Sequence, residues 1–244
     1  SSAISKELHL QYDGYPYLRK HSLYHDFKYV ATKSELKYFV FAVLRNPMEI
    51  AITVFEKMKG NAKGNFTNPK LFSENGGHIT KQHRERFNYI KDNNSSFQQY
   101  FKKFHQKPYD NLSSLTIDNC DFVIKYETIA EDYLLALKKA GISNPKPLPV
   151  ANKTAGKKND MLAYYTEDIK EISIAVFGPF LEKYNYSLPK EWGEVKIPLK
   201  SKLEFLILGV LRKINQKYFK RNTEKKDLEG SIYGDMQRDK LKKS

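Results

Sequence analysis

The stretch "YFVFAVLRNPMEIAITVFEKMKG", residues 38–60, decides the predicted fold. Six apolar residues, Phe39 to Leu44, run into Arg45, and a proline and an amphipathic segment follow at once. The apolar run has the length of a buried strand, and proline is favoured in the first helical turn, where its missing N–H group forfeits no hydrogen bond. We therefore predict a strand at 38–44 and a helix at about 47–58.

A second strand and helix follow later in the chain. "CDFVIKYE" at 120–127 is a buried strand, and an amphipathic segment after it ends at Gly141 with lysines in its last turn, as the helix dipole favours. Strand–loop–helix units predict an α/β fold, a parallel sheet flanked by helices, and we expect one more strand upstream of residue 1.

The remaining segments are mostly helical by their periodicity. Phe97, Tyr100, Phe101 and Phe104 form an aromatic stripe that is more typical of a core than of a sugar platform. We also expect short helices at 3–12 and about 79–91, a helix in two pieces broken near Gly178–Pro179, and a basic amphipathic helix at 199–221.

Composition sets the broad class. The 244 residues, 40% of them apolar, suit one domain with an appendage, and we assign 1–195 to the domain and 196–244 to a basic helix and tail. The single cysteine, Cys120, excludes an intrachain disulfide and favours a reducing, cytoplasmic location. The net charge of +14 favours an anionic ligand through long-range attraction.

Arg45 follows the predicted strand at the edge where α/β folds bind ligands, and Thr53 lies eight residues later in the predicted helix. A guanidinium, a hydroxyl and helix N–H groups together make a phosphate clamp. The alternative is structural: Arg45 pairs with an acid or caps the strand, and Thr53 bonds to its own helix backbone.

These residues resemble a family. "FAVLRNPMEIAITVF" is similar to the 3′-phosphate-binding segment of sulfotransferases that use 3′-phosphoadenosine 5′-phosphosulfate (PAPS), with Arg45, Pro47, Thr53 and Phe55 at its motif positions. Ile50 departs from the carbohydrate branch, which commonly carries a second Arg there. The resemblance implies a P-loop-type sheet and the cofactor PAPS, with adenosine 3′,5′-bisphosphate (PAP) as product and no metal.

Three further places carry the resemblance. One is "DFVIKYETIAEDYLLALKKAGI", whose Tyr126 and Glu127 match the family's aromatic–Glu pair before a helix, a feature that we interpret as mostly structural. "SSAISKEL" resembles the end of the family's phosphosulfate loop, which implies that Ser1 and Ser2 contact the cofactor and that the loop Lys lies upstream; a Ser N-cap on the first helix is the alternative. "LPVANKTAGKKND" and the Tyr-Tyr-Thr after it resemble the ending of carbohydrate sulfotransferases. The cofactor candidates in that loop are Asn152, Lys153 and Thr154, with Lys157 and Lys158 as further phosphate partners.

The resemblance also suggests a catalytic base. "KHSLYHDF" is similar to a His-rich stretch of the uronyl 2-O-sulfotransferases, within the Golgi-type carbohydrate branch, which gives His21 the role of general base and makes His25 its competitor. Structural roles for both histidines stay open. The implied acceptor is a hydroxyl of a carbohydrate or glycolipid, and an acidic one would suit His78, His83, Arg84 and Arg86, which otherwise form a solvated helix face.

Other interpretations remain. A P-loop kinase or NTPase would need a Mg²⁺-binding carboxylate such as Glu127, and a non-catalytic nucleic-acid-binding protein is suggested by charge alone. The helix at 199–221 either packs on the domain or lies on an anionic membrane. The membrane-facing residues would then be Leu203, Phe205, Leu206, Leu208 and Leu211.

Overall fold

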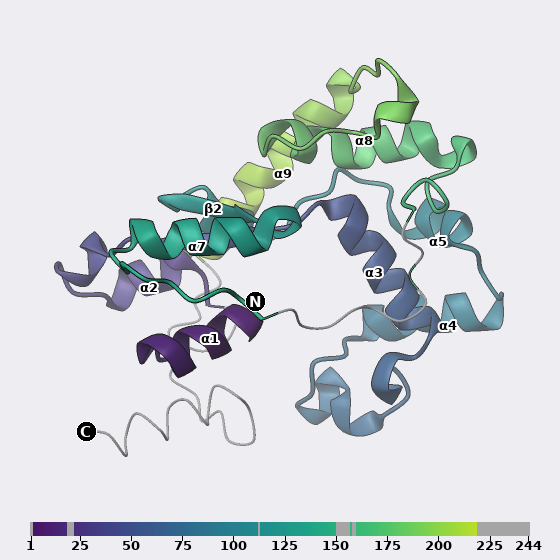
Figure 1. The fold of residues 1–244 in the computed structure, drawn as a ribbon. Coiled ribbons are helices and arrows are strands. Elements are labelled where there is room, and N and C mark those ends of the chain that lie inside the picture. The colour runs from purple at the N-terminus through teal and green to yellow at the C-terminus, as the bar shows by residue number, and fades with distance from the viewer. Residues whose placement is uncertain (1, 19–21, 112, 150–156, 158–159, 219–244) are drawn as a thin grey trace. The chain divides into compact units, whose positions relative to one another are not determined.

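The computed structural model describes residues 2–18, 22–111, 113–149, 157 and 160–218 (Figure 1). The chain divides into two compact units, each assembled from separate stretches of sequence. Unit 1 comprises Ser1–Arg45, Asn111–Ala151 and Val210–Ser244, whereas unit 2 comprises Asn46–Asp110 and Asn152–Gly209.

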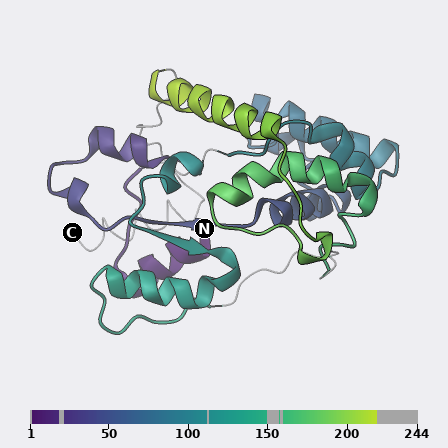
Figure 2. The same cartoon turned by 90° about the horizontal axis from the view of Figure 1, so that it is seen from above.

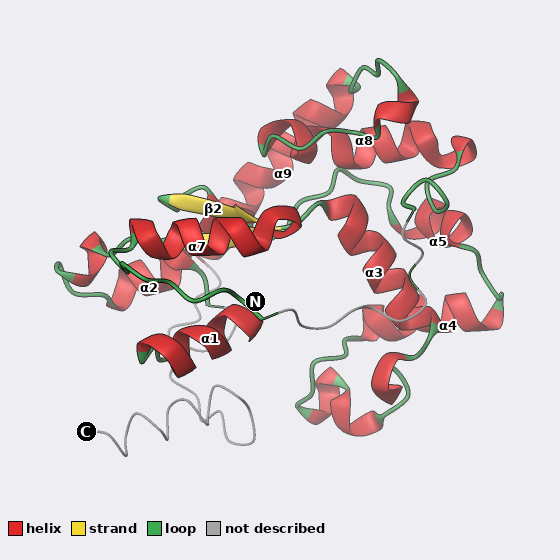
Figure 3. Cartoon of the chain, viewed as in Figure 1, coloured by secondary structure: helices red, strands yellow, loops and turns green. Residues whose placement is uncertain are grey.

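Unit 1 contains a parallel pair of strands, β1 (Phe41–Leu44) and β2 (Phe122–Lys125), drawn in yellow in Figure 3. The register places Leu44 opposite Lys125, so both strands end at the same edge. Both strands were predicted, and the small parallel sheet flanked by helices confirms the mixed fold class.

Helix α7 (Ile129–Lys139) lies along β2, and the turn between them is tightly fixed (Figure 1). The carboxylate of Asp132 accepts hydrogen bonds from the N–H group of Lys125 (2.9 Å) and from the hydroxyl of Thr128 (2.8 Å). Helix α1 (Ser2–Tyr12) contributes Ile4 to the same apolar cluster. The buried members of this cluster are Ile4, Ile124, Tyr133, Ala136 and Leu137.

Unit 1 also contains two short helices. Helix α2 (Tyr24–Val30) joins α6 (Ser114–Ile117) through a hydrogen bond from the N–H group of Tyr24 to the hydroxyl of Thr116, 3.2 Å long. The fully buried Asp26 accepts from the N–H group at the start of α2, which fixes that end of the helix.

Unit 2 is helical and begins with α3 (Pro47–Lys59), where the sequence predicted it. The side chain of Asn46 caps α3 by accepting from the N–H group of Met48 at 2.9 Å. Helices α4 (Lys81–Asp92) and α5 (Phe97–Phe104) start at capping boxes built on Thr80 and Ser96.

The aromatic stripe of α5 is confirmed as core. Phe97, Tyr100 and Phe101 are each at most 3% exposed. Phe97 meets Phe55 of α3 edge to face, with ring centroids 5.4 Å apart, and meets Tyr165 in the same manner at 5.0 Å. Such aromatic pairs stabilise a fold by more than the burial of their surface area accounts for.

Helix α8 (Glu167–Lys183) corrects one prediction, because it continues through Gly178–Pro179 without a break. Pro179 removes one hydrogen bond of the helix, a loss of roughly 3 kcal/mol or more. The N–H group of Tyr109 donates to the carbonyl of Val176 (2.7 Å) in the same turn, and Gly178 lets Ile197 approach so closely that a Cβ atom would lie 2.7 Å from it. Tertiary packing therefore outweighs the local break.

Helix α9 (Leu199–Tyr218) is one continuous helix in Figure 2. Across the described ranges of the chain, no helix has the length and apolar character needed to cross a membrane. Short 3-10 helices link the main elements: Glu35–Lys37, Ala62–Gly64, Pro69–Leu71, Ser73–Asn75, Tyr126–Thr128 and Lys190–Trp192.

Two leucines of α7 give a matched test of the unit 1 core. Leu137 is 1% exposed and Leu135 is 44% exposed on the same helix. Leu137→Ala should lower the free energy of unfolding by about 3 kcal/mol, because it removes a buried side chain and leaves a cavity. Leu135→Ala should change it by less than about 0.5 kcal/mol. Urea unfolding measures both, and equal losses would contradict this assignment of the core.

Candidate functional site

Arg45 leaves β1 at the edge of the sheet where both strands end. Since Leu44 and Lys125 are paired, Arg45 and Tyr126 follow them side by side. The guanidinium of Arg45 lies over the ring of Tyr126, 4.7 Å from its centroid, in a cation–π contact. Within unit 1 this contact orients a half-buried cation at the carboxyl edge.

The start of α3 belongs to unit 2. Helix N-termini attract anions because their N–H groups point outward. Here Pro47 has no N–H group, and the N–H group of Met48 already donates to Asn46. An anion at this end would therefore share the helix donors with the Asn46 side chain.

Thr53 is the seventh residue of α3, and it is 6% exposed. Its hydroxyl donates to the carbonyl of Glu49 at 2.8 Å, as the structural alternative anticipated. Binding to phosphate through this proton requires the hydroxyl to rotate and to give up a hydrogen bond worth about 1 kcal/mol.

The segment beyond the basic loop returns to α3. Lys157 forms an ion pair with Glu49 in the first turn of α3, and both side chains are largely buried. The hydroxyl of Tyr165 donates to the carbonyl of Met48 at 3.0 Å, and the hydroxyl of Tyr164 donates to the carboxylate of Glu56 about two turns later in α3. These contacts thus fasten Lys157, Tyr164 and Tyr165 along one helix.

The charge of Glu49 also affects its neighbour. Burial, followed by the nearby carboxylate of Glu49, raises the pKa of Tyr165 well above its usual value. The phenol therefore stays protonated and remains a donor to Met48. The sequence analysis missed Glu49 as the partner of Lys157, although an acidic residue in the first helical turn is a recognisable signal.

Several predicted residues lie outside the described part of the chain: Ser1, His21, Asn152, Lys153, Thr154 and Lys158. Ser2 is the first residue of α1. Arg45 and Thr53 belong to different units, so each is placed within its own unit. His25 lies on α2, and its Nε2 atom is buried without a hydrogen-bond partner among the described residues.

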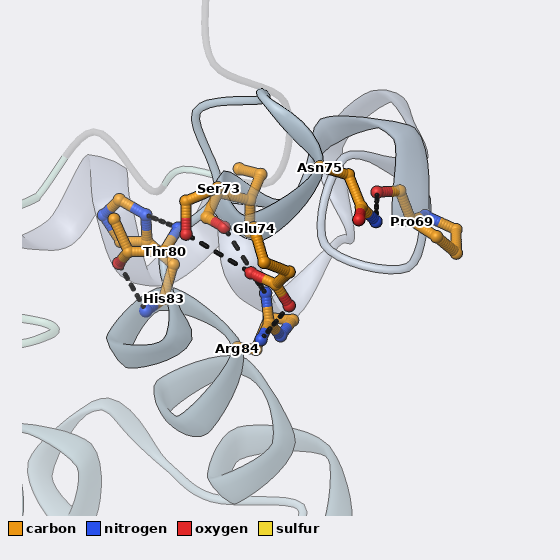
Figure 4. A network of polar contacts seen from close by, with 8 residues as sticks. Pro69, Ser73, Glu74, Asn75, Thr80, His83 and Arg84 are labelled. Atoms are coloured by element: carbon orange, nitrogen blue, oxygen red, sulfur yellow. Dashed lines mark hydrogen bonds and ion pairs between the residues drawn. The ribbon is translucent and has the colours of Figure 1, made fainter.

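Two basic residues of α4, His83 and Arg84, are occupied by local contacts (Figure 4). Arg84 forms a double hydrogen-bonded ion pair with Glu74, its closest N–O distance being 2.6 Å, and lies over the ring of Phe72. This pairing lowers the pKa of Glu74 below its usual value. His83 accepts from the N–H group of Thr80 and so completes the cap of α4.

His105, a half-buried histidine at the end of α5, was not predicted from the sequence. Its ring stacks on Phe101, with centroids 4.6 Å apart, and its Nε2 atom has no hydrogen-bond partner among the described residues. Burial, followed by the charge of Arg86, lowers the pKa of His105 to about 4. His105 is therefore neutral at pH 7 and part of the aromatic core.

The chain was compared with protein-family models, curated proteins and solved structures, and none of the three comparisons gave a match. Among the described residues, no group of three or more His, Cys, Asp or Glu side chains is placed to hold a metal ion.

The pKa of His105 predicts a pH-dependent stability. Below pH 6.5 the unfolded chain takes up a proton that folded His105 does not bind until about pH 4. This histidine therefore lowers the free energy of unfolding as pH falls, by about 2 kcal/mol between pH 7 and pH 5. His105→Phe and His105→Gln should both remove that part of the pH dependence in urea unfolding. A slope unchanged in both variants would show that His105 is not the titrating group.

Proposed function

We propose that the protein is a PAPS-dependent sulfotransferase of the carbohydrate branch, with a P-loop-type sheet. The observation that supports this most is the return of the basic loop's end to the start of α3. In the resembling family, a loop with the pattern of Asn152–Thr154 folds over the nucleotide whose 3′-phosphate lies at that helix. Here Lys157, three residues after Thr154, pairs with Glu49 in the first turn of α3.

The charges at the start of α3 favour an anion there, and a bound phosphate could take the place of the Glu49 carboxylate. The helix dipole and the ammonium of Lys157 are both positive, and the carboxylate of Glu49 balances them. A 3′-phosphate carries more charge and more acceptor oxygens than a carboxylate, so it would compete with Glu49 for Lys157. Glu49 thus acts as an internal counter-ion that the nucleotide replaces.

Arg45 and Thr53 keep their roles from the resemblance. Arg45 directly precedes the N-cap Asn46 in the chain, and its guanidinium can bind two phosphate oxygens at once. Thr53 would contribute its hydroxyl after releasing the carbonyl of Glu49. Both remain proposals.

The proposed chemistry is an in-line transfer to a carbohydrate or glycolipid hydroxyl. When bound, PAPS supplies the sulfuryl group. His21 would accept the proton of the attacking hydroxyl, so that the new S–O bond forms as the bond to the 5′-phosphate breaks. An upstream Lys of the phosphosulfate loop would neutralise the charge on the leaving oxygen, so positioning and electrostatics dominate.

A ligand test separates this function from the alternatives. PAP should raise the melting temperature of the full chain more than ADP with Mg²⁺ does, because only PAP carries a 3′-phosphate for the start of α3. Differential scanning fluorimetry measures the shift. A preference for ADP with Mg²⁺ would instead support a kinase or NTPase, and no shift with either ligand would contradict nucleotide binding.

Single-residue variants locate the binding site. Arg45→Ala and Lys157→Ala should each weaken PAP binding by at least about tenfold, since each removes a charged phosphate partner. Lys33→Ala, which removes an exposed lysine of unit 1, is the matched control and should leave the affinity unchanged. Isothermal titration calorimetry measures the affinity of each variant for PAP. If Arg45→Ala and Lys157→Ala both bind PAP as tightly as the wild-type chain does, the start of α3 is not part of the binding site.

A further inference from the structure

One face of α9 carries an exposed apolar stripe. Its eight large apolar side chains are between 44% and 70% exposed: Leu199, Leu203, Leu206, Ile207, Val210, Leu211, Ile214 and Tyr218. All lie on one continuous helix (Figure 2), so helix geometry alone sets their common face. At about 100° per residue they fall within an arc of about 140°. Scattered exposed leucines need no explanation, but a continuous stripe marks a contact surface.

The opposite side of α9 faces the protein. Ser201, Phe205 and Gln216 are each at most 8% exposed. Phe205, which the sequence analysis placed on the membrane-facing side, therefore belongs to the protein-facing side. The stripe is consequently the exposed side of a helix whose opposite side is buried.

Lysines lie near both edges of the stripe. On the helical projection, Lys202 and Lys213 lie just outside one edge of the stripe, whereas Lys217 and Lys200 lie inside the arc, each about 20° from one of its two edges. Glu204 is the only acidic residue of α9. Two of these lysines have acidic partners: Lys202 lies 2.7 Å from Glu182, and Lys213 lies 3.5 Å from Asp118.

We propose that α9 docks on the surface of an anionic phospholipid membrane. The stripe would enter the boundary between headgroups and acyl chains, with α9 parallel to the surface, and the bordering lysines would reach lipid phosphates. Charge complementarity supports this occupant, because the net charge of the chain is +14 and α9 carries five basic residues against one acid. This inference is independent of the proposed enzymatic function.

A second copy of the chain fits the stripe less well. A coiled-coil seam reaches a lysine in either of two registers: Leu199, Leu203, Leu206 and Val210 continue to Lys213 and Lys217, and Leu203, Ile207, Val210 and Ile214 continue to Lys217. Two copies would then bring like charges together in the seam. On a membrane the same lysines extend toward the phosphates, so their position is favourable.

Vesicle co-sedimentation of the full chain tests the proposal. Wild-type protein should bind vesicles of phosphatidylcholine with about 30% phosphatidylserine at least about tenfold more tightly than pure phosphatidylcholine vesicles. Leu203→Gln/Ile207→Gln/Ile214→Gln leaves the net charge unchanged and should reduce binding to the anionic vesicles at least about tenfold. The matched control is Leu10→Gln/Leu36→Gln/Leu135→Gln, which alters three exposed leucines elsewhere and should bind as wild type does.

Two results would overturn the proposal. Equal vesicle binding by the α9 variant and the control would show that charge alone, spread over the chain, causes the attraction. A wild-type dimer in analytical ultracentrifugation that the α9 variant abolishes, without vesicle binding by wild type, would assign the stripe to contact between copies. Circular dichroism of both triple variants checks that their helix content is unchanged.

Discussion

Burial of α3 against the aromatic side chains of α5 and the segment before α8 is the interaction on which unit 2 depends. Phe55 of α3 contacts Phe97, and Phe97 in turn contacts Tyr165, all within one buried cluster. Because Tyr165 also donates to the carbonyl of Met48, the same packing that forms the core positions the first turn of α3. The core of unit 2 thus holds the first turn of α3, where the 3′-phosphate is proposed to bind.

The electrostatics of that first turn connect stability with function. Glu49 pairs with Lys157 and, after burial, is the next cause of the raised pKa of Tyr165, so one carboxylate acts on both a cation and a neutral donor. Leaving Lys157 without a partner in a largely buried place would be unfavourable. Under the proposed function, a nucleotide phosphate would replace this carboxylate as the partner of Lys157, so that Lys157 would be paired both without and with the ligand.

Local patterns in the sequence were sufficient for most elements. The apolar run before Arg45, the proline after it and the period of the α5 aromatics each reflect a short-range rule, and the structure contains the strands and helices they predict. The continuity of α8 was not predictable, because it depends on Ile197 packing against Gly178. Contacts between distant residues were missed for the same reason: nothing local pairs Lys157 with Glu49, more than a hundred residues away.

The central claim is that the start of α3 binds the 3′-phosphate of an adenosine nucleotide. Calorimetric titration of the wild-type chain with PAP and with adenosine 5′-monophosphate, which lacks only that phosphate, tests it most directly. The account predicts that PAP binds at least about tenfold more tightly, since the extra phosphate gains charge-assisted hydrogen bonds. Equal affinity for the two nucleotides would contradict it.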